Sequence, residues 1–157
     1  MELANKYSEP WHDAEWQRLW LAVEGREWRS LALIPAGEGA SLDFTLVVAM
    51  TLSRTGMVHL GQPLQVADAT RVPLNQLSAF SSEIQRCTEN GQRLLVALPP
   101  TGASAITATI AQSVDAAVLC ILAEKMSSQQ AKRTVQLVGP TRFIGSALFH
   151  PHQLVKR

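Results

Sequence analysis

Hydrophobic and polar positions follow two different periods along the chain, and they predict strands interleaved with helices. Short, continuously apolar runs predict strands at residues 31–34, 57–60, 94–98, 117–122 and 143–149. Between them, apolar residues recur every three or four positions, which predicts helices at residues 10–24, 41–54, 73–89, 103–114 and 127–138. Residues 66–72 fit neither period. Buried strands that alternate with helices are typical of an α/β fold in three layers, with a mostly parallel sheet covered by helices on both faces.

The first predicted helix, at about residues 10–24, is rich in tryptophan. All four tryptophans of the chain fall within its first 28 residues, at Trp11, Trp16, Trp20 and Trp28. Two interpretations are open. The stripe packs the helix against the sheet, or part of it forms an interface, since tryptophan is enriched where proteins bind one another.

Composition narrows the class of protein. With 157 residues, 46% hydrophobic and 17% charged, the sequence predicts one folded domain over residues 1–157 and excludes a disordered chain. The net charge is +1 and the basic residues are scattered, which argues against nucleic acid as a partner. Cys87 and Cys120 provide neither a disulfide framework nor a metal site. No apolar run reaches the roughly 18 residues of a membrane span, and the start lacks signal-peptide features, so we expect a cytoplasmic protein.

One segment has the layout of a phosphate-binding loop. The strand at residues 31–34 leads into the sequence Gly37-Glu38-Gly39-Ala40-Ser41 and then into a helix. Glycines in such a loop let backbone N–H groups turn toward an anion, and the helix N-terminus favours negative charge. A lysine normally precedes the hydroxyl residue, and here that position is Ala40. A tight strand-to-helix turn that uses glycine only for its backbone freedom is the alternative.

The wider context of this loop resembles a known family. Residues 34–41 are similar to the deviant phosphate loop of bacterial tyrosine kinases, relatives of the MinD and ParA ATPases, which reads P-G-E-G-K-S/T. The helix before it carries Glu15 and Arg18 at the places of that family's E-x-x-R-x-R/K self-association motif, with Trp20 in place of the last basic residue. The resemblance extends over about residues 12–150 and implies a P-loop NTPase-like fold.

The acidic residues of that family are missing at the matching positions. Residues 57–65 stand where the family has a strand followed by D-x-D-x-R, and Gly61 and Pro63 replace the two acids. A frame shifted onto residues 67–71 also lacks the pair. At residues 95–100, which resemble the family's I-I-D-T-P-P strand, Ala97 replaces the aspartate. The resemblance therefore implies a kinase-like protein with no catalytic residues, no metal site, and weak or absent binding of ATP and Mg²⁺.

The resemblance also implies a cellular role. Family members act with a membrane polysaccharide co-polymerase in exopolysaccharide and capsule synthesis and export. An inactive member is expected to serve there as a scaffold or regulator, peripheral at the inner membrane through that partner, with self-association into a homo-oligomer as a further form of binding. Its docking surface would include Glu15, Arg18 and Trp20. The alternative is a divergent MinD/ParA-like ATPase or nucleotide sensor completed by residues of another subunit, or a relative of the partitioning ATPases with a different partner.

Overall fold

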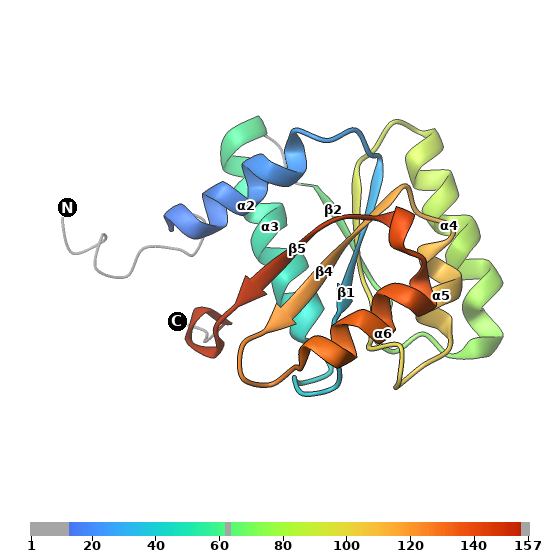
Figure 1. Cartoon of the computed structure of the whole chain (residues 1–157). Helices are drawn as coiled ribbons and strands as arrows, with labels where there is room; N and C mark the ends of the chain where they lie inside the picture. Colours follow the sequence, from blue (N-terminus) through green and yellow to red (C-terminus); the bar gives the residue numbers. More distant parts are fainter. Residues whose placement is uncertain (1–12, 62–63, 155–157) are drawn as a thin grey trace.

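The computed structural model describes residues 13–61 and 64–154, and they form an α/β fold around a five-stranded, all-parallel sheet (Figure 1). The strand order is β2-β3-β1-β4-β5. The strands are β1 (Ser30–Pro35), β2 (Gln65–Asp68), β3 (Leu94–Ala97), β4 (Ala116–Leu122) and β5 (Phe143–Phe149). The helices are α2 (Ala14–Glu24), α3 (Phe44–Leu60), α4 (Leu77–Glu89), α5 (Ile106–Ala111) and α6 (Ser128–Val138), with short 3₁₀ turns η2 (Leu74–Gln76), η3 (Pro140–Arg142) and η4 (Pro151–Leu154).

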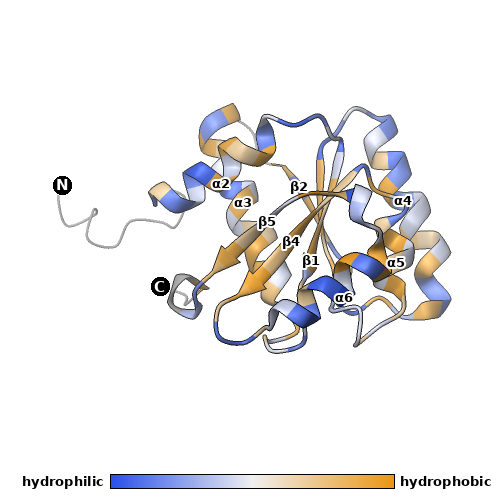
Figure 2. Cartoon of the chain, in the orientation of Figure 1, coloured by the Kyte–Doolittle hydropathy of each residue, from blue (hydrophilic) through white to orange (hydrophobic). Residues whose placement is uncertain are grey.

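Helices cover both faces of the sheet, so the three-layer fold predicted from the sequence is confirmed. Successive strand residues point to opposite faces. Leu31 and Leu33 belong to the core under α2 and α3, whereas Ala32 and Ile34 belong to the core under α4, α5 and α6. Figure 2 shows mostly apolar residues along the strands and a mixture of apolar and polar residues along the helices.

The chain leaves the middle of the sheet in two opposite directions. β1 pairs with β3 on one side and β4 on the other. From β1 the chain crosses through α3 to β2 at one edge, whereas from β4 it crosses through α6 to β5 at the other edge. The loops after β1 and β4 therefore diverge at the carboxyl ends of the strands. In open α/β sheets this is the place where ligands bind.

The prediction of a strand at residues 57–60 is wrong. These residues form the last turn of α3, which ends at Gly61 with a left-handed φ of 82°. Gly56, which resembles a helix stop in the sequence, lies inside the helix because the Trp20 ring packs on it, 3.0–3.2 Å from where a Cβ would stand. The second strand is β2, which begins at Gln65 and overlaps the segment 66–72 that fits neither period.

The tryptophans that the structure describes pack in the core. Trp16, Trp20 and Trp28 are at most 6% exposed, and Trp11 lies outside the described residues. The Trp16 ring lies 5.4 Å from that of Phe149, and Trp20 Nε1 donates a hydrogen bond to His59 Nδ1 over 3.1 Å. The packing interpretation therefore holds for these three residues: Trp16 and Trp20 fix α2 against β5 and α3, and Trp28 Nε1 donates a hydrogen bond to Val23 O near the end of α2.

Candidate functional site

The loop predicted to bind phosphate lies at the divergence of β1 and β4. It runs from Ala36 to Asp43, between the end of β1 and the start of α3. Its residues Gly37, Glu38, Gly39, Ala40 and Ser41 therefore occupy the position expected of a phosphate loop. Gly37 is buried, while Glu38, Gly39 and Ser41 are exposed.

The loop is packed against the segment that connects β4 to α6. A Cβ at Gly39 would overlap the backbone carbonyl of Lys125, and one at Gly37 would stand 2.7 Å from the side chain of Gln130. The start of the loop is fixed as well, because Ala36 N donates to Cys120 O and Thr134 Oγ1 donates to Ala36 O, both over 2.8 Å. The chain's own backbone therefore takes up the space beside the loop.

Two carboxylates of the loop are unfavourable for a phosphate, although Arg133 of α6 borders the cavity beside it. Ser41 Oγ donates to Asp43 Oδ1 over 2.6 Å, so the hydroxyl that would hold Mg²⁺ is engaged with a carboxylate. The carboxylate of Glu38 lies against Gly102 in the β3–α5 loop. Ala40 provides no cation at the lysine position. Sequence reasoning missed Asp43, because the helix predicted at residues 41–54 includes this residue, whereas α3 begins only at Phe44.

The cavity between these loops is small. It measures about 80 Å³ and is bordered by residues from the β1–α3 loop, the β3–α5 loop and α6, Arg133 and Thr134 among them. Pockets that bind small organic ligands measure about 300–1,000 Å³. A nucleotide cannot be enclosed here without movement of the surrounding loops.

The acidic positions need a correction. Gly61 caps α3 and does not follow a strand, so it cannot occupy the first acidic position of the family motif; Pro63 lies outside the described residues. The shifted frame is the one that falls at a strand end, and there Ala67 and Ala69 replace the two acids.

Two further residues lie at this end of the sheet. Ala97 is buried at the end of β3, as expected for the third position, and it pairs with Leu33 on one side and Asp68 on the other. Asp68 is an acidic residue that the sequence reasoning missed, because the strand had been placed too early. Its Oδ1 accepts a hydrogen bond from Thr70 N over 2.9 Å and so closes a local turn.

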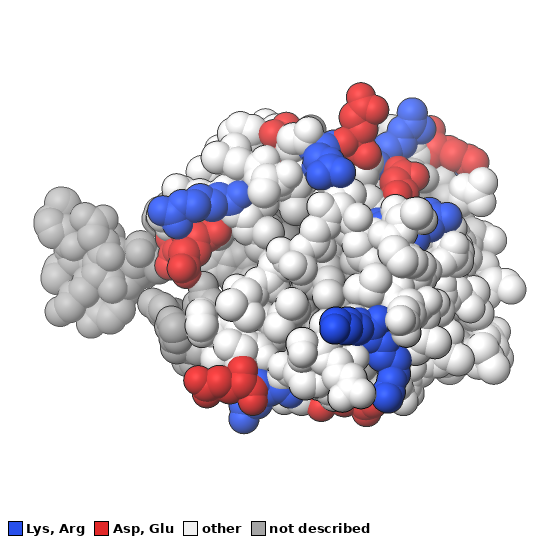
Figure 3. Space-filling model, in the orientation of Figure 1, with Lys and Arg blue, Asp and Glu red and all other residues white. Residues whose placement is uncertain are grey.

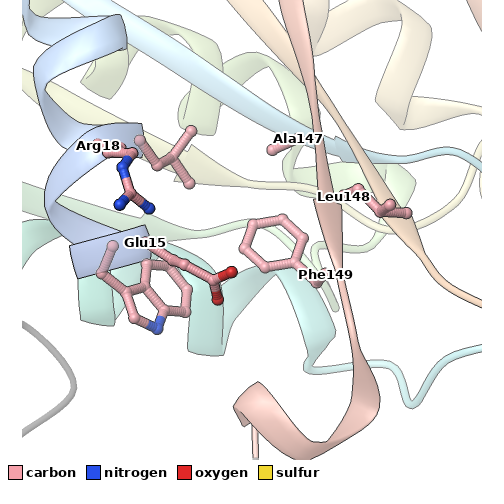
Figure 4. Close-up of a pocket in the computed structure, with 7 residues that line it drawn as sticks. Glu15, Arg18, Ala147, Leu148 and Phe149 are labelled. Atoms are coloured by element: carbon pink, nitrogen blue, oxygen red, sulfur yellow. The ribbon is translucent and has the colours of Figure 1, made fainter. Parts of the chain in front are cut away.

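The three residues of the predicted self-association motif do not share a surface. Glu15 and Arg18 are exposed on α2 and border a groove of about 260 Å³ between this helix and β5 (Figure 4). Trp20 is 1% exposed and points into the core. The assignment of Trp20 to an interface is therefore wrong, because helical periodicity places it on the buried side of α2.

Among residues 13–61 and 64–154, no group of three His, Cys, Asp or Glu side chains could hold a metal ion. Burial raises the pKa of the Cys120 thiol to about 12. Basic and acidic side chains are interspersed on the face shown in Figure 3. Within the part of the chain that the structure describes, no helix has the length and apolar character that a membrane span requires.

No protein-family model, curated protein or solved structure matches this chain. The resemblance to bacterial tyrosine kinases therefore depends on the motif residues themselves.

Proposed function

We propose that this protein is a catalytically inactive relative of the bacterial tyrosine kinases that acts by binding, as a scaffold or regulator of exopolysaccharide or capsule synthesis and export. The observation that carries the proposal is that the loop has the position of a phosphate loop but no room for a nucleotide. The loop has the family's glycines and its place after β1, yet Gly39 lies against the Lys125 carbonyl where a nucleotide would need room.

The chemistry of phosphoryl transfer supports the absence of catalysis. The reaction depends on cations and a bound metal that neutralise charge on the transferred phosphate. This chain has Ala40 in place of the lysine and alanines at 67, 69 and 97 in place of the acids. Loss of one group that stabilises a transition state typically costs about 10²–10³ in rate, and these losses fall on one catalytic unit.

The partner follows from the resemblance. A membrane polysaccharide co-polymerase, or a related export-complex protein, is the proposed partner, and it would hold the protein at the inner membrane. The exposed pair Glu15 and Arg18 on α2 supplies charged groups for docking. Self-association and docking are both compatible with such a role, and neither requires a nucleotide.

A genetic experiment tests this function. In the source bacterium, deletion of the gene is expected to change the amount or chain length of an extracellular polysaccharide. A Ser41→Ala copy should restore it, since the loop hydroxyl does no chemistry, whereas an Arg18→Glu copy should restore it poorly. Arg71→Glu, an exposed arginine near the opposite edge of the sheet, is the matched control and should restore it fully. An unchanged polysaccharide after deletion, or a Ser41→Ala copy as defective as the deletion, would contradict the proposal.

A further inference from the structure

The strand β5 ends the sheet with an edge that carries no charge. It is seven residues long, Phe-Ile-Gly-Ser-Ala-Leu-Phe, and contains neither a charged residue nor proline. Edge strands of monomeric proteins are usually protected by charges, proline or a covering element. The opposite edge, β2, has only four residues and ends in Asp68. Leu148 of β5 is 59% exposed, and Figure 3 shows an uncharged surface over this part of the sheet.

The backbone of β5 has free pairing capacity at two positions. Phe149 O accepts a hydrogen bond from Ala123 N over 2.8 Å, so the backbone of Phe149 faces the β4 side. Because backbone groups alternate in direction along a strand, Ala147 also faces β4, while Ser146 and Leu148 direct their N–H and C=O groups outward. Among the described residues, no strand lies beyond this edge.

The side chains of β5 are complementary in size to those of a second β5 strand that runs in the opposite direction. Residues 145–149 read Gly-Ser-Ala-Leu-Phe, and in antiparallel pairing centred on Ala147 each large residue lies opposite a small one. Leu148 would face the partner's Ser146, and Phe149 would face the partner's Gly145. In this register Ser146 and the partner's Leu148 also form a hydrogen-bonded pair, because both direct their backbone groups outward.

The groove beside β5 suits the same arrangement. Ala147 and Phe149 point toward α2, whereas Leu148 points to the other side of the strand (Figure 4). Glu15 and Arg18 border the groove on the helix. Glu15 and Arg18 give this side of the groove one charge of each sign, and a two-fold axis brings the same pair of charges from a second copy to the same face of the joined sheet.

We propose that a second copy of this chain binds along β5, antiparallel and about a two-fold axis near Ala147, so that two five-stranded sheets join into one. The occupant is the same strand of an identical chain, since the reversed sequence supplies both the matching sizes and the outward backbone groups. This inference does not depend on the proposed function.

The oligomeric state tests the proposal. Light scattering after size-exclusion chromatography should give the wild type twice the 17.1 kDa mass of one chain, at concentrations up to ~100 μM, where a dimer of micromolar affinity is largely formed. Leu148→Lys should give one chain mass. The matched control is Leu137→Lys on α6, where the leucine is 56% exposed, and it should remain a dimer. A monomeric wild type, or a Leu148→Lys dimer, would overturn the proposal.

A size exchange tests the register. Ser146→Leu places two large residues opposite each other, and Leu148→Ser removes the apolar contact, so each change alone should weaken the dimer at least tenfold. The double variant restores one large and one small residue at each pair and should recover most of the affinity. Ser146 and Leu148 are both exposed, and thermal unfolding of each variant verifies the fold. A double variant as weak as the worse single change would overturn the register.

Discussion

Single residues of this protein show where two parts of the chain approach too closely for a side chain. Gly39 lies against the Lys125 carbonyl and Gly56 lies against the Trp20 ring, and neither has the positive φ that usually explains a glycine. Both glycines therefore serve packing. In the sequence they are indistinguishable from glycines that make turns.

We predict that Gly56→Ala destabilises the protein despite the better helix propensity of alanine. The gain of about 1 kcal/mol from propensity is opposed by about 1–3 kcal/mol of overpacking, because the Trp20 ring is buried and hydrogen-bonded to His59. Urea unfolding measures the change. In a Trp20→Phe background the smaller ring leaves room, so Gly56→Ala should become neutral or stabilising. An equal cost in both backgrounds would show that the ring is not the cause.

The two cysteines should differ sharply in reactivity. Cys120 is fully buried and its pKa is raised to about 12, so at neutral pH it carries almost no thiolate, the form that reacts. Cys87 is partly exposed on α4. We expect a thiol reagent such as DTNB to modify one thiol in the folded protein and two after unfolding in urea. Cys87→Ser should remove the fast reaction and Cys120→Ala should retain it; two fast thiols in the native protein would contradict this.

At the scale of elements, the sequence predicts best those strands whose residues form an apolar run without charges, and the edge strand β5 (Phe143–Phe149) is found at its predicted bounds. β1, β3 and β4 are continuous apolar runs, and their predicted bounds lie within a residue of those observed. The start of α6 was also predictable, because Ser127 forms a capping box with Gln130. An uncharged apolar run of strand length leaves a signal that does not depend on distant contacts.

The errors in predicting helices and strands occur where a contact with a distant part of the chain determines the local structure. The last turn of α3 has apolar residues that are exposed, so it resembles a strand, and Gly56 resembles a helix stop until the Trp20 ring is placed over it. β2 is an edge strand with a mixed pattern of exposure, so it carries no continuous apolar run. Because the second strand was predicted at residues 57–60, the comparison with the family's two acids fell on Gly61 and Pro63.

The hydrogen bond between Thr134 on α6 and Ala36 in the loop after β1 is expected to stabilise the fold. Thr134 is buried and donates to the Ala36 carbonyl, so Thr134→Val keeps the shape but leaves that carbonyl without this donor. We expect a loss of about 1–3 kcal/mol in the free energy of unfolding, measured in urea. Thr109→Val, an exposed threonine on α5, should change it by less than about 0.5 kcal/mol. Equal effects of the two changes would rule out a role for the hydrogen bond.

For the whole molecule, the position of the candidate site was predictable from the sequence, but the filling of the space beside its loop by the Lys125 backbone was not. The glycines and Ser41 identify the loop, and the missing lysine and acids are visible in the sequence. That Lys125 approaches Gly39 depends on how the loops after β1 and β4 diverge, which no local pattern encodes. The sequence thus shows which charged groups the loop lacks, and the structure adds that the backbone at Lys125 fills the space beside Gly39.

The missing charged groups and the filled space beside the loop can be tested separately. If only the lysine were missing, Ala40→Lys would recover nucleotide binding. Because the Lys125 carbonyl lies beside the loop and the acids are absent as well, we expect Ala40→Lys to leave ATP binding undetectable by calorimetry. A gain to micromolar affinity from this one change would show that the loop opens readily and that charge alone was limiting.

The most direct test of the account is calorimetric titration of the wild-type protein with ATP and ADP, each with and without Mg²⁺. We predict no saturable heat, corresponding to a dissociation constant weaker than ~1 mM. Saturable, Mg²⁺-dependent binding of ATP at micromolar concentrations would contradict the account. It would show that the loop moves away from the Lys125 carbonyl and would favour a nucleotide sensor completed by a second subunit.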